Sequence, residues 1–456
     1  MKHFIKLITI ITLLITFSCN LQEVNENPNA VIEAPVTVLL PPAQASMANA
    51  LMNENSATVG IFLQYFEPNN NTQYSPYAEY FVDNSFYVED IWYDYYVNAL
   101  VQIKDIIEKS ESAGAYHYTG IAQIMMAWTL GTVTDNWGDV PYSTALQGSL
   151  ALTPTYDAQS DIYEDIFELL NDGIANLDKE STMDASDYDI LYGGNVTLWK
   201  KAAYGLIARY SLHVVNKSAE VGFDPLQQTL NAVQNSYDYT DMPLAYEYGY
   251  DEADKSPYNI GKNNTDLVIN DYFKTLVASH PSKDGITKTQ LGSADTGPYL
   301  SDLNAKAYFV TPWEVKFIEA EARLRTNTTD PLIQTALREA VEAFLTEVAP
   351  FDDQLTTDSI SSYVSHITLT GNYEADLETI MMQKYISMFG QVEQWSDFRR
   401  TGYPALIPNP NGTSAQNPNG EIPRRYPYPQ NEMELNGGNV PSTGVNMQAR
   451  VWWDEE

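Results

Sequence analysis

The stretch TLWKKAAYGLIARYSLHVV, residues 197–215, decides the fold class of this chain. Its apolar and small residues recur three and four positions apart, as on one face of a helix. They are Trp199, Ala202, Ala203, Leu206, Ile207 and Tyr210. Gly205 adds a point at which a second helix can approach closely. The stretch therefore predicts one half of a helical hairpin of the tetratricopeptide type.

Helical periodicity continues on both sides of this stretch. Apolar stripes predict further helices over residues 42–53, 83–110, 118–133, 161–177, 313–324, 331–348, 373–389 and 392–400, and another that begins at Pro225. Short links between such helices favour antiparallel pairs. The strict repeat of roughly 34 residues that defines tetratricopeptide proteins is not present. We predict a mainly α fold, with tetratricopeptide-like helical hairpins packed against an irregular, loop-rich region.

Three segments interrupt the helical pattern. Residues 68–77 are rich in turn-forming Pro, Asn and Ser, so we expect no regular element there. Residues 237–310 hold many Tyr, Asn, Asp and Gly, with one modest helix candidate near 266–278. Long loops inside a compact protein are usually functional. The tail after Thr401, rich in Pro, Asn and Gly, is expected to wrap the helices as ordered coil.

The N-terminus has the pattern of a secretory signal. Lys2 and Lys6 precede an apolar run from Leu7 to Phe17, which is too short to span a membrane. Cys19, the only cysteine, stands where the run ends, and the pattern resembles a bacterial lipoprotein signal. We predict a signal peptide over residues 1–18 and acylation of Cys19. An incidental cysteine behind a plain signal is the alternative.

The predicted mature chain consists of a lipidated N-terminus and tether, residues 19–41, and a single domain, residues 42–456. The full chain has 25 Lys and Arg against 60 Asp and Glu, a formal net charge of −35. Such a surface repels nucleic acid and anionic lipid, so neither is expected as a partner. With Cys19 acylated no thiol remains, and packing alone must stabilise the fold.

The sequence offers little support for catalysis or metal binding. Four mature histidines lack the spacing of a zinc site on a helix. They are His117, His213, His280 and His366. No nucleophile elbow, phosphate loop, dinucleotide fingerprint or complete calcium loop occurs, so no metal and no cofactor are predicted. Asp135 and Asp139 could form the acid pair of a glycosidase. Because Trp137 and Gly138 lie between them just after a helix, we favour a role in which the two residues cap helices and shape a turn.

Several motifs follow one another along the mature chain. They are Asn27-Pro28-Asn29, Trp137-Gly138-Asp139-Val140-Pro141-Tyr142, Glu319-Ala320-Glu321-Ala322, Trp395-Ser396-Asp397-Phe398-Arg399-Arg400-Thr401-Gly402 and Pro423-Arg424-Arg425-Tyr426-Pro427-Tyr428-Pro429. Together with the lipoprotein start they resemble the SusD/RagB family, nutrient-binding outer-membrane lipoproteins of Bacteroidetes. The resemblance implies a helical body of tetratricopeptide-like pairs beside a larger irregular region.

The same resemblance implies a function without catalysis. Proteins of this family bind oligosaccharide or peptide nutrients at the cell surface and cap a SusC-like TonB-dependent transporter. We therefore expect a cell-surface lipoprotein, anchored in the outer membrane through Cys19, that captures a glycan or another nutrient. A lipid-anchored, all-helical glycoside hydrolase is the alternative.

Sugar rings present apolar C–H faces that stack on Trp and Tyr, and the chain has 32 Tyr against 15 Phe and 8 Trp. We predict glycan contacts from aromatic residues in or near the irregular segments: Tyr74, Tyr77, Trp92, Tyr93, Tyr246, Tyr248, Tyr250 and Tyr299. Trp92 also lies close to the apolar stripe of its helix, so packing is an equal alternative.

A scaffold role is predicted for the motif residues. Four arginines, Arg399, Arg400, Arg424 and Arg425, are expected to hold the coil against the helices through ion pairs. Trp137, Gly138, Asp139 and Pro141 are expected to shape the turn after their helix.

Overall fold

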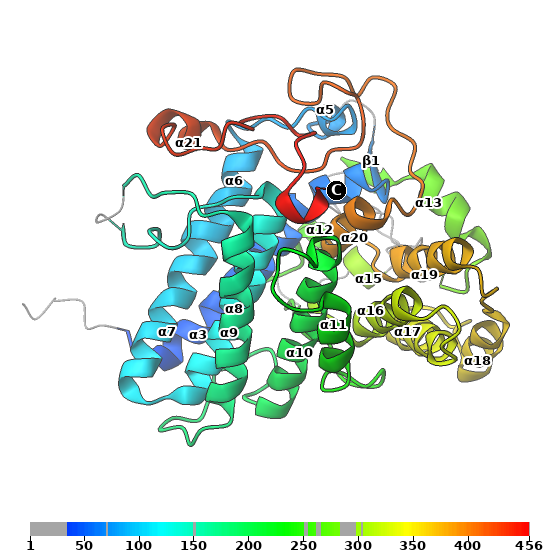
Figure 1. The fold of residues 1–456 in the computed structure, drawn as a ribbon, viewed down its shortest axis with the longest axis horizontal. Coiled ribbons are helices and arrows are strands. Elements are labelled where there is room, and N and C mark those ends of the chain that lie inside the picture. The colour runs from blue at the N-terminus through cyan, green and yellow to red at the C-terminus, as the bar shows by residue number, and fades with distance from the viewer. Residues whose placement is uncertain are drawn as a thin grey trace, which may run out of the picture. The chain divides into compact units, whose positions relative to one another are not determined.

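Helices make up most of the chain in the computed structural model, which describes residues 34–69, 72–148, 152–249, 254–260, 266–282, 298–301 and 304–455 (Figure 1). The helices of the first half are α3 (Val36–Met52), α4 (Glu54–Phe62), α5 (Ser75–Ala78), α6 (Tyr87–Tyr93), the π-helical segment η1 (Asp94–Leu100), α7 (Val101–Ala113), α8 (Tyr116–Trp137), α9 (Gln159–Leu177), α10 (Val196–His213) and α11 (Pro225–Val233). Those of the second half are α12 (Pro257–Ile260), α13 (Asp271–Leu276), α15 (Pro298–Ser301), α16 (Pro312–Thr326), α17 (Leu332–Val348), α18 (Thr357–His366), α19 (Tyr373–Ser387), α20 (Glu393–Thr401) and α21 (Gln430–Leu435). The predicted mainly α fold is confirmed.

Neighbouring helices pack closely in pairs, and α7, α8 and α9 stand side by side in Figure 1. The contact between α8 and α9 is made where both helices have glycine. A Cβ atom added at Gly120 would lie 2.7 Å from the carbonyl oxygen of Gly173. On α8, Gly131 leaves room for the ring of Tyr210 from α10 in the same way. Small residues thus set the close approach of these helices.

The folded unit begins at Val36, six residues before the predicted start of the domain. Helix α3 includes Pro41 and Pro42, whereas the sequence predicted a helix that begins only at residue 42. A buried stripe through Val36, Leu40 and Ala43 holds this first part of the helix in place despite the prolines. Residues 36–41 therefore belong to the helical body and not to the tether. Cys19 and the predicted signal peptide lie outside the described residues.

Two short antiparallel sheets correct the expectations for the irregular segments. Strand β1 (Phe66–Pro68) pairs with β3 (Leu267–Ile269), and β2 (Leu244–Glu247) pairs with β4 (Lys306–Val310). Residues 68–77 thus include the end of a strand and the short helix α5. The helix predicted at 266–278 is instead β3 followed by α13, because the side chain of Asn270 accepts a hydrogen bond from the Tyr272 amide and caps a new helix there.

The tail after Thr401 is mostly ordered coil, as expected, and it packs into the helical core. The backbone amide of Tyr426 donates to the carbonyl of Asn136 at 2.8 Å. The hydroxyl of Tyr428 donates to the carbonyl of Asp139 at 2.7 Å. Trp453, in a short 3-10 turn, is fully buried. In the described part of the chain no helix is both long and apolar enough to cross a membrane.

Candidate functional site

The predicted aromatic residues Trp92 and Tyr93 lie at the end of α6. The helix continues from there through the π-helical segment η1 into α7. The ring of Trp92 stacks on that of Tyr96, with centroids 4.5 Å apart and planes 24° apart. This pair forms because residues four apart share one face of a helix. Tyr93 is 55% exposed, so its ring is open to a ligand.

A groove of about 480 Å³ runs beside these rings. One wall is formed by α6, η1 and the start of α7, and the others by residues 141–148, 152–154 and 429–432. Val97 and Val101 extend the exposed strip of Tyr93 along the first wall. The volume is in the range of sites for small ligands, and the lining combines apolar surface with a few polar groups.

Two of the motifs that suggested the family, residues 137–142 and 423–429, contribute Pro141 and Pro429 to the lining of this groove. The ring of Trp92 meets that of Trp137 edge to face, with centroids 5.1 Å apart. The indole nitrogen of Trp137 donates to the carbonyl of Pro427 at 2.9 Å, and the hydroxyl of Tyr96 donates to the carbonyl of Pro141 at 2.8 Å. Gly138 has φ of +86°, a conformation that favours glycine, and it turns the chain from α8 toward this wall. The motifs therefore hold the aromatic platform in position.

The polar groups of the groove are mainly carboxylates. Glu89 accepts a hydrogen bond from the backbone amide of Asn431 at 2.9 Å. Glu432 accepts one from the hydroxyl of Tyr156 at 2.9 Å. Burial and then the neighbouring Asp94 raise the pKa of Asp90 above its usual value. The groove thus has acceptors for sugar hydroxyls next to an aromatic platform.

The other predicted contact residues are largely covered, and Trp92 itself is only 9% exposed because its ring packs on Tyr96 and Trp137. The rings of Tyr77, Tyr246, Tyr248 and Tyr299 are buried in the core. Tyr74 is half-buried and its hydroxyl donates to Glu54 at 3.2 Å. Tyr250 lies outside the described residues. Among the predicted aromatics that the structure describes, only Trp92 and Tyr93 meet in one groove of ligand size.

The four motif arginines lie between helices and tail. Arg400 pairs with Glu321 and Asp397, and Arg424 pairs with Asp454. In contrast, Arg399 and Arg425 form no ion pair with a described residue. Carbonyl groups and aromatic rings stabilise the charges of these two arginines instead.

Arg399 lies between two indole rings, with its guanidinium carbon 4.3 Å from the centroid of Trp395 and 4.7 Å from that of Trp453. It donates to the carbonyls of Asp135 and Arg424, at 2.6 and 2.8 Å. Burial lowers its pKa to about 10. The guanidinium carbon of Arg425 lies 4.3 Å from the ring centroid of Tyr428. These arginines therefore join tail and helices through carbonyls and rings.

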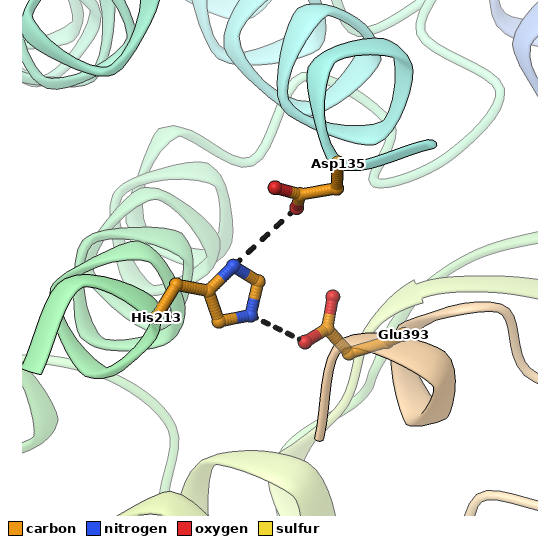
Figure 2. Close-up of side chains that lie close together, drawn as sticks. All are labelled: Asp135, His213 and Glu393. Carbon is orange, nitrogen blue, oxygen red and sulfur yellow. Dashed lines mark hydrogen bonds and ion pairs between the residues drawn. The ribbon is translucent and has the colours of Figure 1, made fainter. Parts of the chain in front are cut away.

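A buried cluster of three ionisable residues lies deeper in the molecule (Figure 2). His213 from α10 stands between Asp135 from α8 and Glu393 from α20. Its Nε2 lies 2.7 Å from Glu393, and its Nδ1 lies 3.3 Å from Asp135. The arrangement resembles a metal site or a catalytic triad, and no local spacing of residues predicted it.

The hydrogen bonds of this cluster decide its protonation. The hydroxyl of Tyr163 donates its single proton to Asp135 at 2.6 Å, so it must accept at its 2.9 Å contact with Nδ1 of His213. Nε2 faces the carboxylate of Glu393 and donates as well. His213 therefore carries protons on both nitrogens. Although burial alone would lower its pKa, Glu393 and Asp135 raise that pKa to about 9.

An imidazolium has no lone pair for a metal ion and cannot act as a general base. The cluster is also enclosed, because Trp453 donates to Asp135 at 2.8 Å and the adjoining cavity is only about 20 Å³. Arg209 forms an ion pair with Glu393 at 3.5 Å and a bidentate pair with Glu314, with both distances 2.6 Å. We conclude that this cluster joins α8, α10, α16 and α20, and that it is not the functional site.

Residues 28–280 and 246–429 match the SusD-like family described as "Starch-binding associating with outer membrane". The matched segments cover most of the chain. The chain belongs to the SusD-like family. The resemblance to SusD/RagB proteins predicted from the motifs is thereby confirmed. No curated protein matches the chain.

Solved structures share the SusD-like fold over almost the whole chain. A SusD/RagB family protein from Bacteroides thetaiotaomicron is 23% identical, with a TM-score of 0.76 over 92% of this chain and 99% of that one. A chitin-binding protein is also 23% identical, with a TM-score of 0.77 over 92% and 100%. A chitin-binding SusD homolog from Flavobacterium johnsoniae is 18% identical, with a TM-score of 0.73 over 92% and 98%.

The groove of this SusD-like chain includes residues that the sequence interpretation missed. Tyr96 is one, and its position four residues after Trp92 was the available signal. Glu432 and Asn431 come from the tail, more than 300 residues from α6, and no local pattern connects them to it.

Proposed function

We propose that this SusD-like chain binds oligosaccharides in the groove beside Trp92 and Tyr93 and delivers them to a SusC-like TonB-dependent transporter. The observation that supports binding is the exposed ring of Tyr93 next to the Trp92–Tyr96 stack, in a groove of about 480 Å³. Aromatic faces stack on sugar rings, and Glu89, Asp90 and Asn431 can bond the hydroxyls. The two chitin-binding structures of the same fold support a glycan as ligand.

Binding without catalysis is part of this proposal. Asp135, one member of the acid pair considered from the sequence, is engaged with His213, Tyr163 and Trp453 inside the core. A polysaccharide cannot reach it there. Native gels containing soluble polysaccharides test the proposal directly, since binding slows the migration of the protein. Release of reducing ends by the pure protein at enzymatic rates would instead support a hydrolase.

The Tyr93→Ala variant should bind glycan about 3- to 10-fold more weakly than the wild type, because one exposed stacking face is lost. Titration calorimetry with the polysaccharide that retards the protein measures the change. Tyr188→Ala is the matched control, since Tyr188 is 38% exposed and lies outside the groove. Equal affinities for wild type and Tyr93→Ala would place the binding site elsewhere.

We further propose that acylated Cys19 anchors the protein in the outer membrane, where the transporter also resides. Gently solubilised membranes of the native host should yield the wild type together with the transporter. A Cys19→Ala variant cannot be acylated, so it should appear in the soluble fraction. Retention of Cys19→Ala in the membrane would contradict the lipid anchor, and a wild type that purifies alone would contradict the stable complex.

A further inference from the structure

The walls of the groove carry negative charge. Among its lining residues that the structure describes, three are carboxylates and none is Lys, Arg or His. The carboxylates are Glu89, Asp90 and Glu432. The whole chain has a formal net charge of −35, so the long-range field has the same sign.

No cation in the described part of the chain neutralises these carboxylates. None of the three forms an ion pair with a described residue. Glu89 accepts one hydrogen bond from a backbone amide, and Glu432 accepts from Tyr156 and from Asn436 at 3.2 Å. Asp90 lies beside a second carboxylate, Asp94, and not beside a cation. The groove therefore has uncompensated negative charge that a cationic ligand would relieve.

Two cations near the walls do not offset this charge. Lys104, one turn beyond Val101 on α7, is paired with Glu108 on the same helix. Arg425 is buried and stacks on Tyr428, and it does not line the groove. A bound ligand would thus meet carboxylates and aromatic rings first.

We propose that the groove selects oligosaccharides of amino sugars with free ammonium groups and rejects uronic-acid oligosaccharides. This inference rests on the proposed glycan-binding function and names the chemical class of its ligand. An ammonium group gains from the carboxylates and from the exposed face of Tyr93, because aromatic quadrupoles attract cations. A uronate gains the same stacking of its ring but is repelled at every carboxylate.

Titration calorimetry with three matched probes tests the selectivity. The probes are β-1,4-linked hexamers of glucosamine, of N-acetylglucosamine and of glucuronic acid, with the glucosamine amines protonated. The glucosamine hexamer should bind about tenfold more tightly than the acetylated one, and its advantage should shrink as salt screens the charges. The glucuronic acid hexamer should not bind measurably.

A double variant, Glu89→Gln with Asp90→Asn, isolates the effect of charge. Both substitutions keep hydrogen-bond acceptors, including the one that Asn431 needs, and both positions lie on the surface of α6. The variant should lose most of its preference for glucosamine, measured as the ratio of its affinities for the glucosamine and the acetylated hexamers. Glu108→Gln, on α7 outside the groove, should leave the preference unchanged.

The possible outcomes separate this inference from the proposed function. Equal or tighter binding of the acetylated hexamer overturns the selectivity while leaving glycan binding supported. A preference for glucosamine that survives in the double variant also overturns it. Failure of all three hexamers to bind rejects the inference, whereas the proposed function is judged by the polysaccharide gels and the Tyr93→Ala variant.

Discussion

A Glu321→Gln variant should lose about 3 to 5 kcal/mol of its free energy of unfolding. Glu321 from α16 and Arg400 from α20 form a bidentate ion pair with side chains that are 1% and 0% exposed. Burial alone would raise the pKa of Glu321, but Arg400 and Arg325 hold it well below its usual range. Neutral glutamine removes one of the two carboxylates that pair with the buried guanidinium of Arg400. Water cannot take the place of the lost carboxylate, because the site is closed to solvent. Urea denaturation of wild type and variant measures the loss.

Glu319→Gln provides the control on the same helix. Glu319 pairs with Arg323 at 2.8 Å, but both side chains are partly open to water, so the loss should stay below about 1 kcal/mol. Similar losses for the two variants, or a loss below about 1 kcal/mol for Glu321→Gln, would show that the buried pair stabilises the fold little more than a partly exposed one.

The free energy of unfolding should fall by roughly 3 kcal/mol as the pH rises from 6.5 to well above 9. His213 has a folded-state pKa of about 9, raised above the 6.5 of the unfolded chain by Glu393 and Asp135. A raised pKa means that the folded state holds its proton more tightly. The stabilisation is therefore fully present below pH 6.5 and is lost as the pH passes through about 9. Urea denaturation at a series of pH values measures the decrease.

Substitution at His213 distinguishes the effect of its proton on stability from the effects of the other groups that titrate. A His213→Gln variant should be less stable at neutral pH, and the decrease between pH 6.5 and 9 should largely disappear. His366→Gln, at an exposed histidine on α18, should retain the wild-type decrease. A wild type with constant stability over this range would contradict the imidazolium deduced from the hydrogen bonds.

The long helices could be predicted because each has one buried face, and a buried face leaves a periodic pattern in the sequence. Helix α4 has no such pattern, since every residue from Asn55 to Phe62 is buried. Strands β1 and β3 are three residues each and pair across about 200 positions, which is too short and too distant for periodicity. Helix α18 was missed although Thr356 and Ser359 form a capping box at its start.

The candidate site was predictable in part. The composition of the irregular segments pointed to aromatic contacts, and Trp92 and Tyr93 do line a groove. The same argument also selected Tyr77, Tyr248 and Tyr299, because composition cannot distinguish an exposed ring from a buried one. The cluster around His213 escaped prediction, since Glu393 is 180 residues away and only the folded chain brings them together.

The burial of Trp453 has a consequence for how the protein is made. Its indole hydrogen bonds to Asp135 across 318 positions of the chain and covers one side of Arg399. At a synthesis rate of about 5 to 20 residues per second, roughly 15 to 60 s pass between the two residues. During that time α8 can form, but Trp453 does not yet cover Asp135 near the C-terminal end of this helix. The environment of Asp135 and Arg399 is therefore completed only after residue 453 has been added.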